Sequence, residues 1–253
     1  MDLPTVGLGT MGIEDPDVIA SAIEMGYRHL DTAQIYQNEE SVGEGISRAE
    51  VSREELTVAT KVWADSLAPA DVRESTEESL DRLGLDSVDV LYVHRPIEAY
   101  DPEATLPAFD SLREDGLIDH VGVSNFTIDQ LEEAREILAG PIAAHQVEMH
   151  PLYGQRELLE YARSAGHTLV AYSPLAQGAV FELPEIREVA EERGVSEAEV
   201  SLAWLAAKDG VVTIPKASSE DHLEANLAAP DLELTAEERE RIEGIEEERK
   251  LFE

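Results

Sequence analysis

Short apolar runs alternate with longer acidic stretches along the whole chain, and this alternation predicts the secondary structure. The short runs are rich in Val, Leu and Ile, which is typical of buried strands. The longer stretches carry apolar residues at helical spacing with acidic residues between them. The predicted strands cover residues 6–10, 29–33, 56–61, 88–94, 121–125, 143–148, 169–173 and 211–215. The predicted helices cover residues 16–26, 39–47, 69–83, 102–114, 128–138, 157–164, 185–193, 197–208, 220–227 and a stretch after Thr235.

Residues at the helix ends support two of these predictions. Asp15 is a suitable N-cap for the first helix, and Gly26 is a suitable stop. Thr235 is followed three residues later by Glu238, which is the pattern of a capping box.

Eight strands that alternate with helices predict a parallel α/β sheet. Nearly continuous apolar strands indicate that both faces of the sheet are covered. Eight such units in 253 residues fit a closed (β/α)8 TIM barrel better than an open doubly wound sheet, because this barrel needs about 250 residues. No linker-like stretch divides the chain, so we expect a single domain over residues 1–253.

The chain is strongly acidic, with 55 acidic residues, 19 basic residues and a formal net charge of −36. Such a surface repels nucleic acid and anionic membranes, so we expect neither as a partner. Only four of the basic residues are lysines, Lys61, Lys208, Lys216 and Lys250. This composition predicts a halophilic protein, because about 1 M salt screens charge repulsion beyond about 3 Å.

The absence of cysteine excludes disulfides and thiolate metal sites. No apolar run approaches the roughly 18 residues of a membrane span. The first residues do not have the pattern of a signal peptide. We therefore expect a cytoplasmic protein.

Polar side chains gather at the C-terminal ends of the predicted strands, where barrels of this type place their active sites. They are Asp31, Lys61, His94, Asn125, Glu148, Ser173 and Lys216. Tyr36 follows in the loop after the second strand. Because these residues come from different strands, the fold would bring them to one mouth of the barrel.

Four of these residues have the chemistry needed to protonate a carbonyl oxygen that accepts hydride. The oxygen needs a proton donor and an electrostatic stabiliser. Tyr36 is a poor donor at its ordinary pKa of about 10, but a neighbouring Lys61 cation would lower that pKa. Asp31 would hold the lysine charged and oriented. His94 could donate a hydrogen bond to the same oxygen.

Each residue also has a simpler interpretation when it is taken alone. Asp31 could be a helix cap, Tyr36 a packed aromatic residue and His94 a loop histidine. Lys61 is harder to explain in this way in a chain with so few lysines. The presence of all four residues together favours an acid site over these separate structural roles.

At these residues the sequence resembles the aldo-keto reductase family, from about residue 3 to residue 226. The similar segments are residues 26–33, 36, 38–39, 42–43, 60–63, 91–96, 122–126, 146–151 and 171–175, in the order of the family. Arg95 departs from the pattern, because tryptophan is frequent at its position. The acidic composition fits a prokaryotic, haloarchaeal member.

The resemblance implies hydride transfer from NADPH, NADH or both to a small aldehyde or ketone, with no metal. Tyr36 would donate the proton with the help of Lys61 and Asp31, and His94 would orient the carbonyl. Three residues would hold the nicotinamide carboxamide: Ser124, Asn125 and Gln146. Tyr172 would stack on the nicotinamide ring, and Ser173 and Leu175 would line the pyrophosphate.

The adenosine end departs further from the family. Lys216 is expected near the 2′-phosphate or the ribose, and Asn226 near the adenine. Members that use NADP usually have arginine where this chain has His222. Arginine grips a phosphate bidentately at any pH and neutral histidine cannot, so dual use or a preference for NADH becomes a hypothesis.

Less of the substrate pocket can be inferred. Trp63 is expected to form one wall and Met11 another, although core packing explains Met11 equally well. The chain stops soon after the last predicted helix, which favours an open pocket for small carbonyls such as simple aldehydes or sugar-derived keto acids. The family default is a monomer, and bound ions could support a weak dimer.

Two other functions compete with the active reductase. The first is a reductase-like module that binds the cofactor, senses redox state and turns over little. The presence of all four acid-site residues argues against it. The second is an isomerase or aldolase, since a barrel alone hosts many chemistries and Lys61 could be offered as a Schiff-base lysine. The reductase explains more of the residues.

Overall fold

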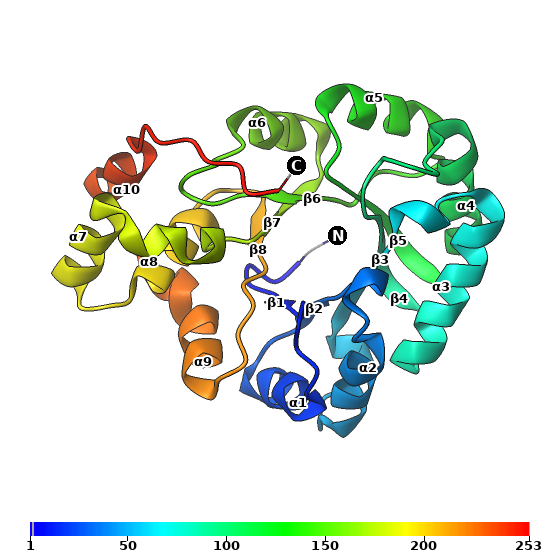
Figure 1. Cartoon of the computed structure of the whole chain (residues 1–253), viewed down its shortest axis with the longest axis horizontal. Helices are drawn as coiled ribbons and strands as arrows, with labels where there is room; N and C mark the ends of the chain where they lie inside the picture. The colour runs from blue at the N-terminus through cyan, green and yellow to red at the C-terminus, as the bar shows by residue number, and fades with distance from the viewer. Residues whose placement is uncertain (2, 253) are drawn as a thin grey trace.

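The computed structural model describes residues 1 and 3–252 and contains one sheet of eight parallel strands. Strands that follow one another in sequence pair side by side from β1 to β8. The strands are β1 (Leu8–Gly9), β2 (His29–Asp31), β3 (Thr57–Val62), β4 (Val88–Val93), β5 (Ile118–Ser124), β6 (Ala144–Glu148), β7 (Thr168–Tyr172) and β8 (Val211–Thr213). Figure 1 shows these strands at the centre of a ring of helices.

The N-terminal segment joins the last strand and closes the sheet. The Gly7 amide donates to the Thr213 carbonyl at 2.8 Å, and the Thr213 amide donates to the Thr5 carbonyl at 2.9 Å. Gly9 approaches β8 so closely that a Cβ at this position would stand 2.6 Å from the Ile214 carbonyl oxygen. The single-domain (β/α)8 barrel expected from the sequence is confirmed.

The helices surround the sheet and follow the predicted order. They are α1 (Pro16–Met25), α2 (Glu39–Arg48), α3 (Pro69–Leu83), α4 (Pro102–Glu114), α5 (Ile128–Ile137), α6 (Arg156–Ala165), α7 (Pro184–Arg193), α8 (Glu197–Ala206), α9 (Glu220–Ala228) and α10 (Ala236–Glu243). The predicted caps of α1 are confirmed, since Asp15 accepts a hydrogen bond from the Asp17 amide and Gly26 has a φ of 119°. The capping box at Thr235 and Glu238 is confirmed too.

Most strand and helix boundaries lie within two residues of the prediction, and five short 3-10 segments were not predicted. β1 is only two residues long, and β5 begins three residues before the predicted Val121. The segments are η1 (Gln34–Tyr36), η2 (Arg53–Glu55), η3 (Ala64–Ser66), η4 (Ala176–Glu182) and η5 (Ala229–Asp231). Most of them are single turns, and one turn is too short to leave a hydrophobic period in the sequence.

Side chains fill the inside of the barrel, so the mouth is the part left for chemistry. Tyr92 packs there with Ala59, Val90, Ala144, Val170, Val212 and Ile214. Gly122 makes room for the Tyr92 ring, because a Cβ at this position would stand 2.5 Å from it. Two larger apolar clusters lie between the strands and the outer helices.

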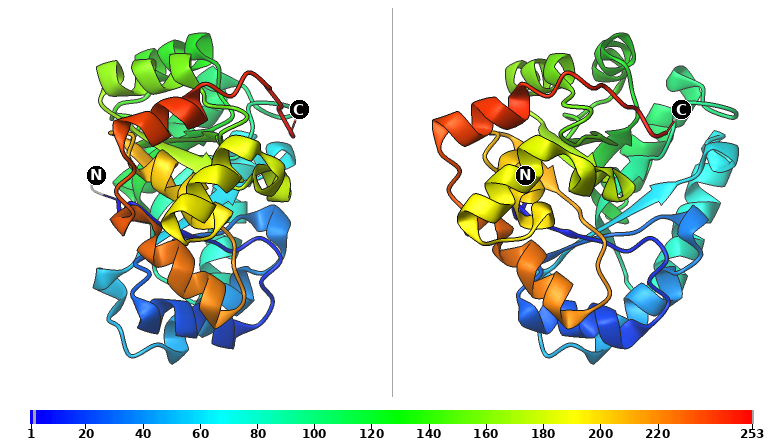
Figure 2. Two further views of the ribbon diagram at one scale, coloured as in Figure 1. Left: turned by 90° about the vertical axis from the view of Figure 1, so that its left-hand side faces the viewer. Right: turned by 60° about the vertical axis from the view of Figure 1, so that its left-hand side comes forward.

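The two ends of the chain lie at opposite ends of the barrel axis, as the left view of Figure 2 shows. The segment after α10 has no regular structure and returns towards the centre of the ring (Figure 1). Among the described residues, no helix is both long and apolar enough to cross a lipid bilayer.

Candidate active site

A buried ion pair lies at the C-terminal ends of β2 and β3. The Lys61 ammonium is 2.5 Å from Asp31 Oδ1 and 2.7 Å from the Thr32 carbonyl, and both side chains are almost fully buried. Burial lowers the pKa of Lys61, but Asp31 and Tyr36 outweigh burial and hold the pKa above its ordinary value. Lys61 is therefore a fixed cation beneath the mouth.

Tyr36 lies directly over this cation, at the end of η1. The Lys61 ammonium is 5.1 Å from the centroid of the Tyr36 ring. Burial raises the pKa of Tyr36, and Lys61 opposes the effect without overcoming it. Lys61 acts in the direction expected from the sequence, but the effect of burial is larger, so the pKa of Tyr36 lies above its ordinary value. Tyr36 is consequently protonated at neutral pH.

His94 follows β4 and faces the same point. Its ring meets Tyr36 edge-on with centroids 6.1 Å apart, and it meets Trp63 edge-on at 5.0 Å. Burial, followed by the charges of Lys61 and Arg95, lowers the pKa of His94 to about 3. A neutral imidazole can donate a hydrogen bond and is not an acid at neutral pH.

The structure thus brings together the four residues singled out for acid chemistry. A phenol, a fixed ammonium and a neutral imidazole converge at the mouth, and a carboxylate holds the ammonium from below. This set can deliver a proton to an oxygen that gains negative charge and can stabilise the charge that remains.

Amide groups lie beside the cluster, at the ends of β5 and β6. Gln146 donates from Nε2 to Asp31 Oδ2 at 2.6 Å. Asn125 donates from Nδ2 to the His94 carbonyl at 3.1 Å and to Ser124 Oγ at 3.0 Å. The Tyr172 hydroxyl donates to Asn125 Oδ1 at 2.9 Å. The residues expected at a nicotinamide carboxamide are therefore tied to the acid cluster.

The residues expected at the rest of the cofactor follow β7 and β8. Ser173 and Leu175 come directly after β7 and are partly exposed. Lys216 follows β8, and His222 lies in the first turn of α9; both side chains are exposed. Asn226 is buried in the same helix. The positive end of the α9 dipole lies in this region. The hydroxyl and amide groups at one end fit a nicotinamide, and at the other end Lys216 supplies a cation beside the acidic first turn of α9, which carries Glu220 and Asp221.

The two residues expected in the substrate pocket have different surroundings. Trp63 is partly buried and packs against His94. Met11 follows β1 and is 57% exposed, which excludes core packing as its role. A large cavity of about 1540 Å³ reaches the mouth at Arg95, Asn125 and Tyr172, but most of it lies outside the barrel over α6 and α10.

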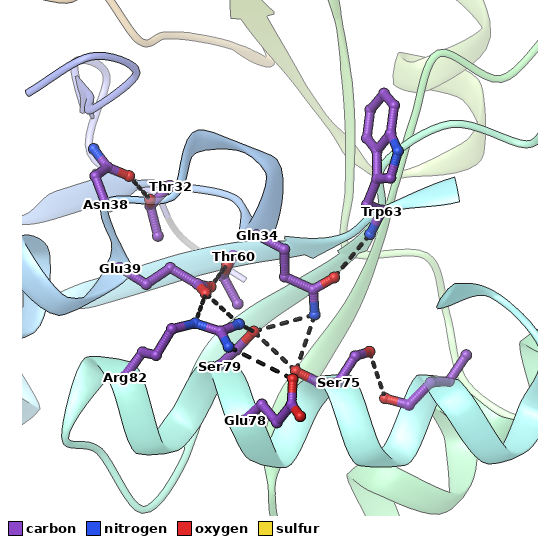
Figure 3. Close-up of polar contacts among 11 residues, drawn as sticks. Thr32, Gln34, Asn38, Glu39, Thr60, Trp63, Ser75, Glu78, Ser79 and Arg82 are labelled. Carbon is purple, nitrogen blue, oxygen red and sulfur yellow. Dashed lines mark hydrogen bonds and ion pairs between the residues drawn. The ribbon is translucent and has the colours of Figure 1, made fainter. Parts of the chain in front are cut away.

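Hydrogen bonds fix the short segment that carries Tyr36, as Figure 3 shows. Gln34 donates from Nε2 to the Ser75 carbonyl at 3.0 Å and to Ser79 Oγ at 3.1 Å in α3. Its Oε1 accepts from the Trp63 amide at 2.9 Å. The same side chain thus ties η1 to α3 and to the end of β3.

Glu39 ties the following helix to the same neighbours (Figure 3). It is buried and accepts from Thr60 Oγ1 at 2.5 Å and from Arg82 Nε at 2.8 Å. No role was predicted for Gln34 or Glu39 from the sequence. For Glu39 a signal existed, because it lies in one of the segments that resemble the family.

Comparisons with known proteins agree with this geometry. The model of the aldo/keto reductase family matches residues 5–247. A methylglyoxal reductase of Salmonella typhi, DkgB, is 36% identical over 252 residues, which cover 97% of this chain and 94% of that protein. A glyoxal reductase of Bacillus subtilis is 36% identical over 256 residues, which cover 99% of this chain and 92% of that protein.

A solved structure gives the same result for the fold. The aldose reductase of Schistosoma japonicum superposes with a TM-score of 0.92 at 29% identity, over 100% of this chain and 91% of that chain. The chain belongs to the aldo/keto reductase family and is an NAD(P)H-dependent oxidoreductase that reduces carbonyl groups.

Proposed function

We propose that the protein reduces small aldehydes and ketones with Tyr36 as the proton donor. The observation that carries this proposal is the buried Lys61–Asp31 pair beneath Tyr36, next to a neutral His94. A buried ion pair is costly unless other interactions compensate for it. Because the pair lies under the Tyr36 phenol at the barrel mouth, Lys61 can stabilise the phenolate that forms when Tyr36 gives up its proton.

The proton follows a simple route in this proposal. A nicotinamide cofactor held at this site would supply hydride to the carbonyl carbon, and the Tyr36 hydroxyl would give its proton to the carbonyl oxygen. The phenolate that remains is stabilised by Lys61, which Asp31 keeps oriented. His94 donates a hydrogen bond to the carbonyl oxygen and sets its direction.

The chain's own residues define the proposed cofactor site. Three residues hold the nicotinamide carboxamide: Ser124, Asn125 and Gln146. Tyr172 stacks on the ring, and Ser173 and Leu175 line the pyrophosphate. Lys216 and Asn226 contact the adenosine end. His222 in place of arginine leaves room for both NADPH and NADH.

The proposed substrates are short carbonyls bounded by Trp63 and Met11. Methylglyoxal and glyoxal, named for two of the relatives, have the size that such a site accepts.

We propose a cytoplasmic protein adapted to concentrated salt, because repulsion among 55 acidic residues, against only 19 basic ones, requires screening by salt. It acts as a monomer or a weak dimer.

Steady-state oxidation of NADPH and of NADH, measured side by side in concentrated KCl, tests this function. Methylglyoxal and glyoxal are the first substrates, followed by simple aldehydes and keto sugars. We expect turnover with at least one cofactor. A folded protein that binds the cofactor and turns over none of these carbonyls would contradict the proposal and favour a cofactor-binding module.

A further inference from the structure

The segment that follows α10 is packed onto the barrel rather than free. We call residues 245–252 the C-terminal strap. Ile245 and Leu251 pack against the apolar cluster that lies between β6, β7 and the outer helices. The Arg249 amide donates to the Leu152 carbonyl at 2.9 Å. In Figure 1 the strap is the last red segment, which runs from α10 towards the centre of the ring.

A buried carboxylate holds the far end of the strap. Glu148 is the last residue of β6 and is only 2% exposed. Its Oε1 accepts from the Leu251 amide at 2.7 Å, and its Oε2 accepts from the Phe252 amide at 3.0 Å. The strap therefore ends on both oxygens of one side chain.

His150 supplies the third donor to the same carboxylate. Its Nε2 is 2.9 Å from Glu148 Oε1. Burial lowers the pKa of His150 below its ordinary value, so the ring is neutral and its one hydrogen must lie on Nε2 to donate. A buried carboxylate is costly unless hydrogen bonds compensate for it. Here two of the three compensating donors come from the strap.

The hydrogen bonds from the strap to Glu148, which we call the clasp, place Phe252 beside Tyr172 at the proposed nicotinamide site. The Phe252 ring meets Tyr172 edge-on, with centroids 5.6 Å apart. The hydroxyl of Tyr172 is fixed at the other end by Asn125. Tyr172 is therefore held on two sides, and one of them depends on the strap.

We propose that Glu148 is a positioning residue that clasps the C-terminal strap and so holds Phe252 against Tyr172, which makes the strap a retaining element for the nicotinamide end of the cofactor. The inference rests on the proposed role of Tyr172. Glu148, at the end of β6, takes no part in proton delivery, and its role in this proposal is to hold the strap. The cofactor is then released more slowly while Phe252 contacts Tyr172.

Three variants test the clasp by cofactor binding. Glu148→Gln keeps the size of the side chain but leaves one amide oxygen for two backbone donors. Phe252→Ala removes the ring contact and leaves the anchor intact. Glu246→Gln makes the same change of charge at an exposed strap position and is the matched control. The Kd of NADPH is measured by the fluorescence of the bound nicotinamide, and the dissociation rate by stopped flow.

We expect Glu148→Gln and Phe252→Ala each to raise the Kd about tenfold through faster dissociation, which is the size of one lost packing or charged contact. The double variant should be little worse than either single variant, because both act through one contact. The control should bind like the original protein. A purely structural role would instead lower the melting temperature without cofactor and leave the Kd unchanged.

Unchanged NADPH binding in Phe252→Ala would overturn the proposal, as would an equal loss in the control. Phe252 is only partly buried, so this variant stays informative if Glu148→Gln fails to fold. Failure of the reductase function gives a different result. A protein that binds NADPH and reduces no carbonyl would still report on the strap, whereas one that binds no nicotinamide cofactor would remove the basis of both.

Discussion

At the scale of single residues, we propose that His222 determines whether the protein distinguishes NADPH from NADH by the 2′-phosphate. It is exposed in the first turn of α9, close in sequence to Lys216. A neutral imidazole gives a 2′-phosphate one weak contact, whereas a guanidinium gives two charged hydrogen bonds.

We expect His222→Arg to shift the ratio of kcat/KM for NADPH over NADH towards NADPH by about tenfold or more, since hydrogen bonds to charged groups are worth about 1.5–3 kcal/mol. Glu224→Gln, an exposed change in the same helix, is the control for charge. An unchanged ratio would mean that the 2′-phosphate does not lie near this helix end.

The four residues of the candidate acid site could be selected from the sequence because their types are chemically complementary and each lies at or just after the end of a strand. The protonation states of these residues could not be predicted from the sequence. Whether Tyr36 has a raised or a lowered pKa depends on burial against the Lys61 charge, and burial follows from packing that a one-dimensional pattern does not contain.

At the scale of elements, Glu39 joins α2 to β3 and α3 just after the segment that carries Tyr36. We expect Glu39→Gln to lower the free energy of unfolding by about 1–3 kcal/mol, because a buried charged acceptor is lost. Urea unfolding measures this change. Glu40→Gln, its exposed neighbour, should have almost no effect. Equal stability of the two variants would show that the network in Figure 3 contributes little.

Helices and strands were predictable where the apolar period is long or a cap is explicit, as at Asp15, Gly26 and Thr235. The C-terminal strap was not. The residues after α10 have no apolar period, yet they return to the mouth of the barrel. They do so through backbone amides bound to Glu148, and backbone donors leave no mark in a sequence.

At the scale of the whole molecule, we propose that the net charge of −36 makes the stability of the fold depend on the salt concentration. Repulsion among carboxylates extends about 10 Å at 0.1 M salt and about 3 Å at 1 M. We therefore expect the melting temperature and the activity to rise together as KCl is raised from dilute buffer to molar concentration. Sucrose at matched water activity, which does not screen charge, should not reproduce the gain in activity.

Full activity and an unchanged melting temperature in dilute buffer would contradict adaptation to salt.

The barrel itself was predictable at this scale, since eight alternating units and a chain of 253 residues leave few alternatives. Its closure through Gly7 and Gly9 was visible only in three dimensions, because it depends on backbone contacts with β8.

The most direct test of the central claim compares Tyr36→Phe with the original protein in two measurements on the same preparation. The first is the Kd of NADPH, and the second is kcat for the best carbonyl substrate. We expect kcat to fall by about 10²–10⁴-fold and the Kd to stay the same, because only the proton donor is removed. A variant that binds NADPH and keeps most of its turnover would contradict the assignment of Tyr36 as the acid.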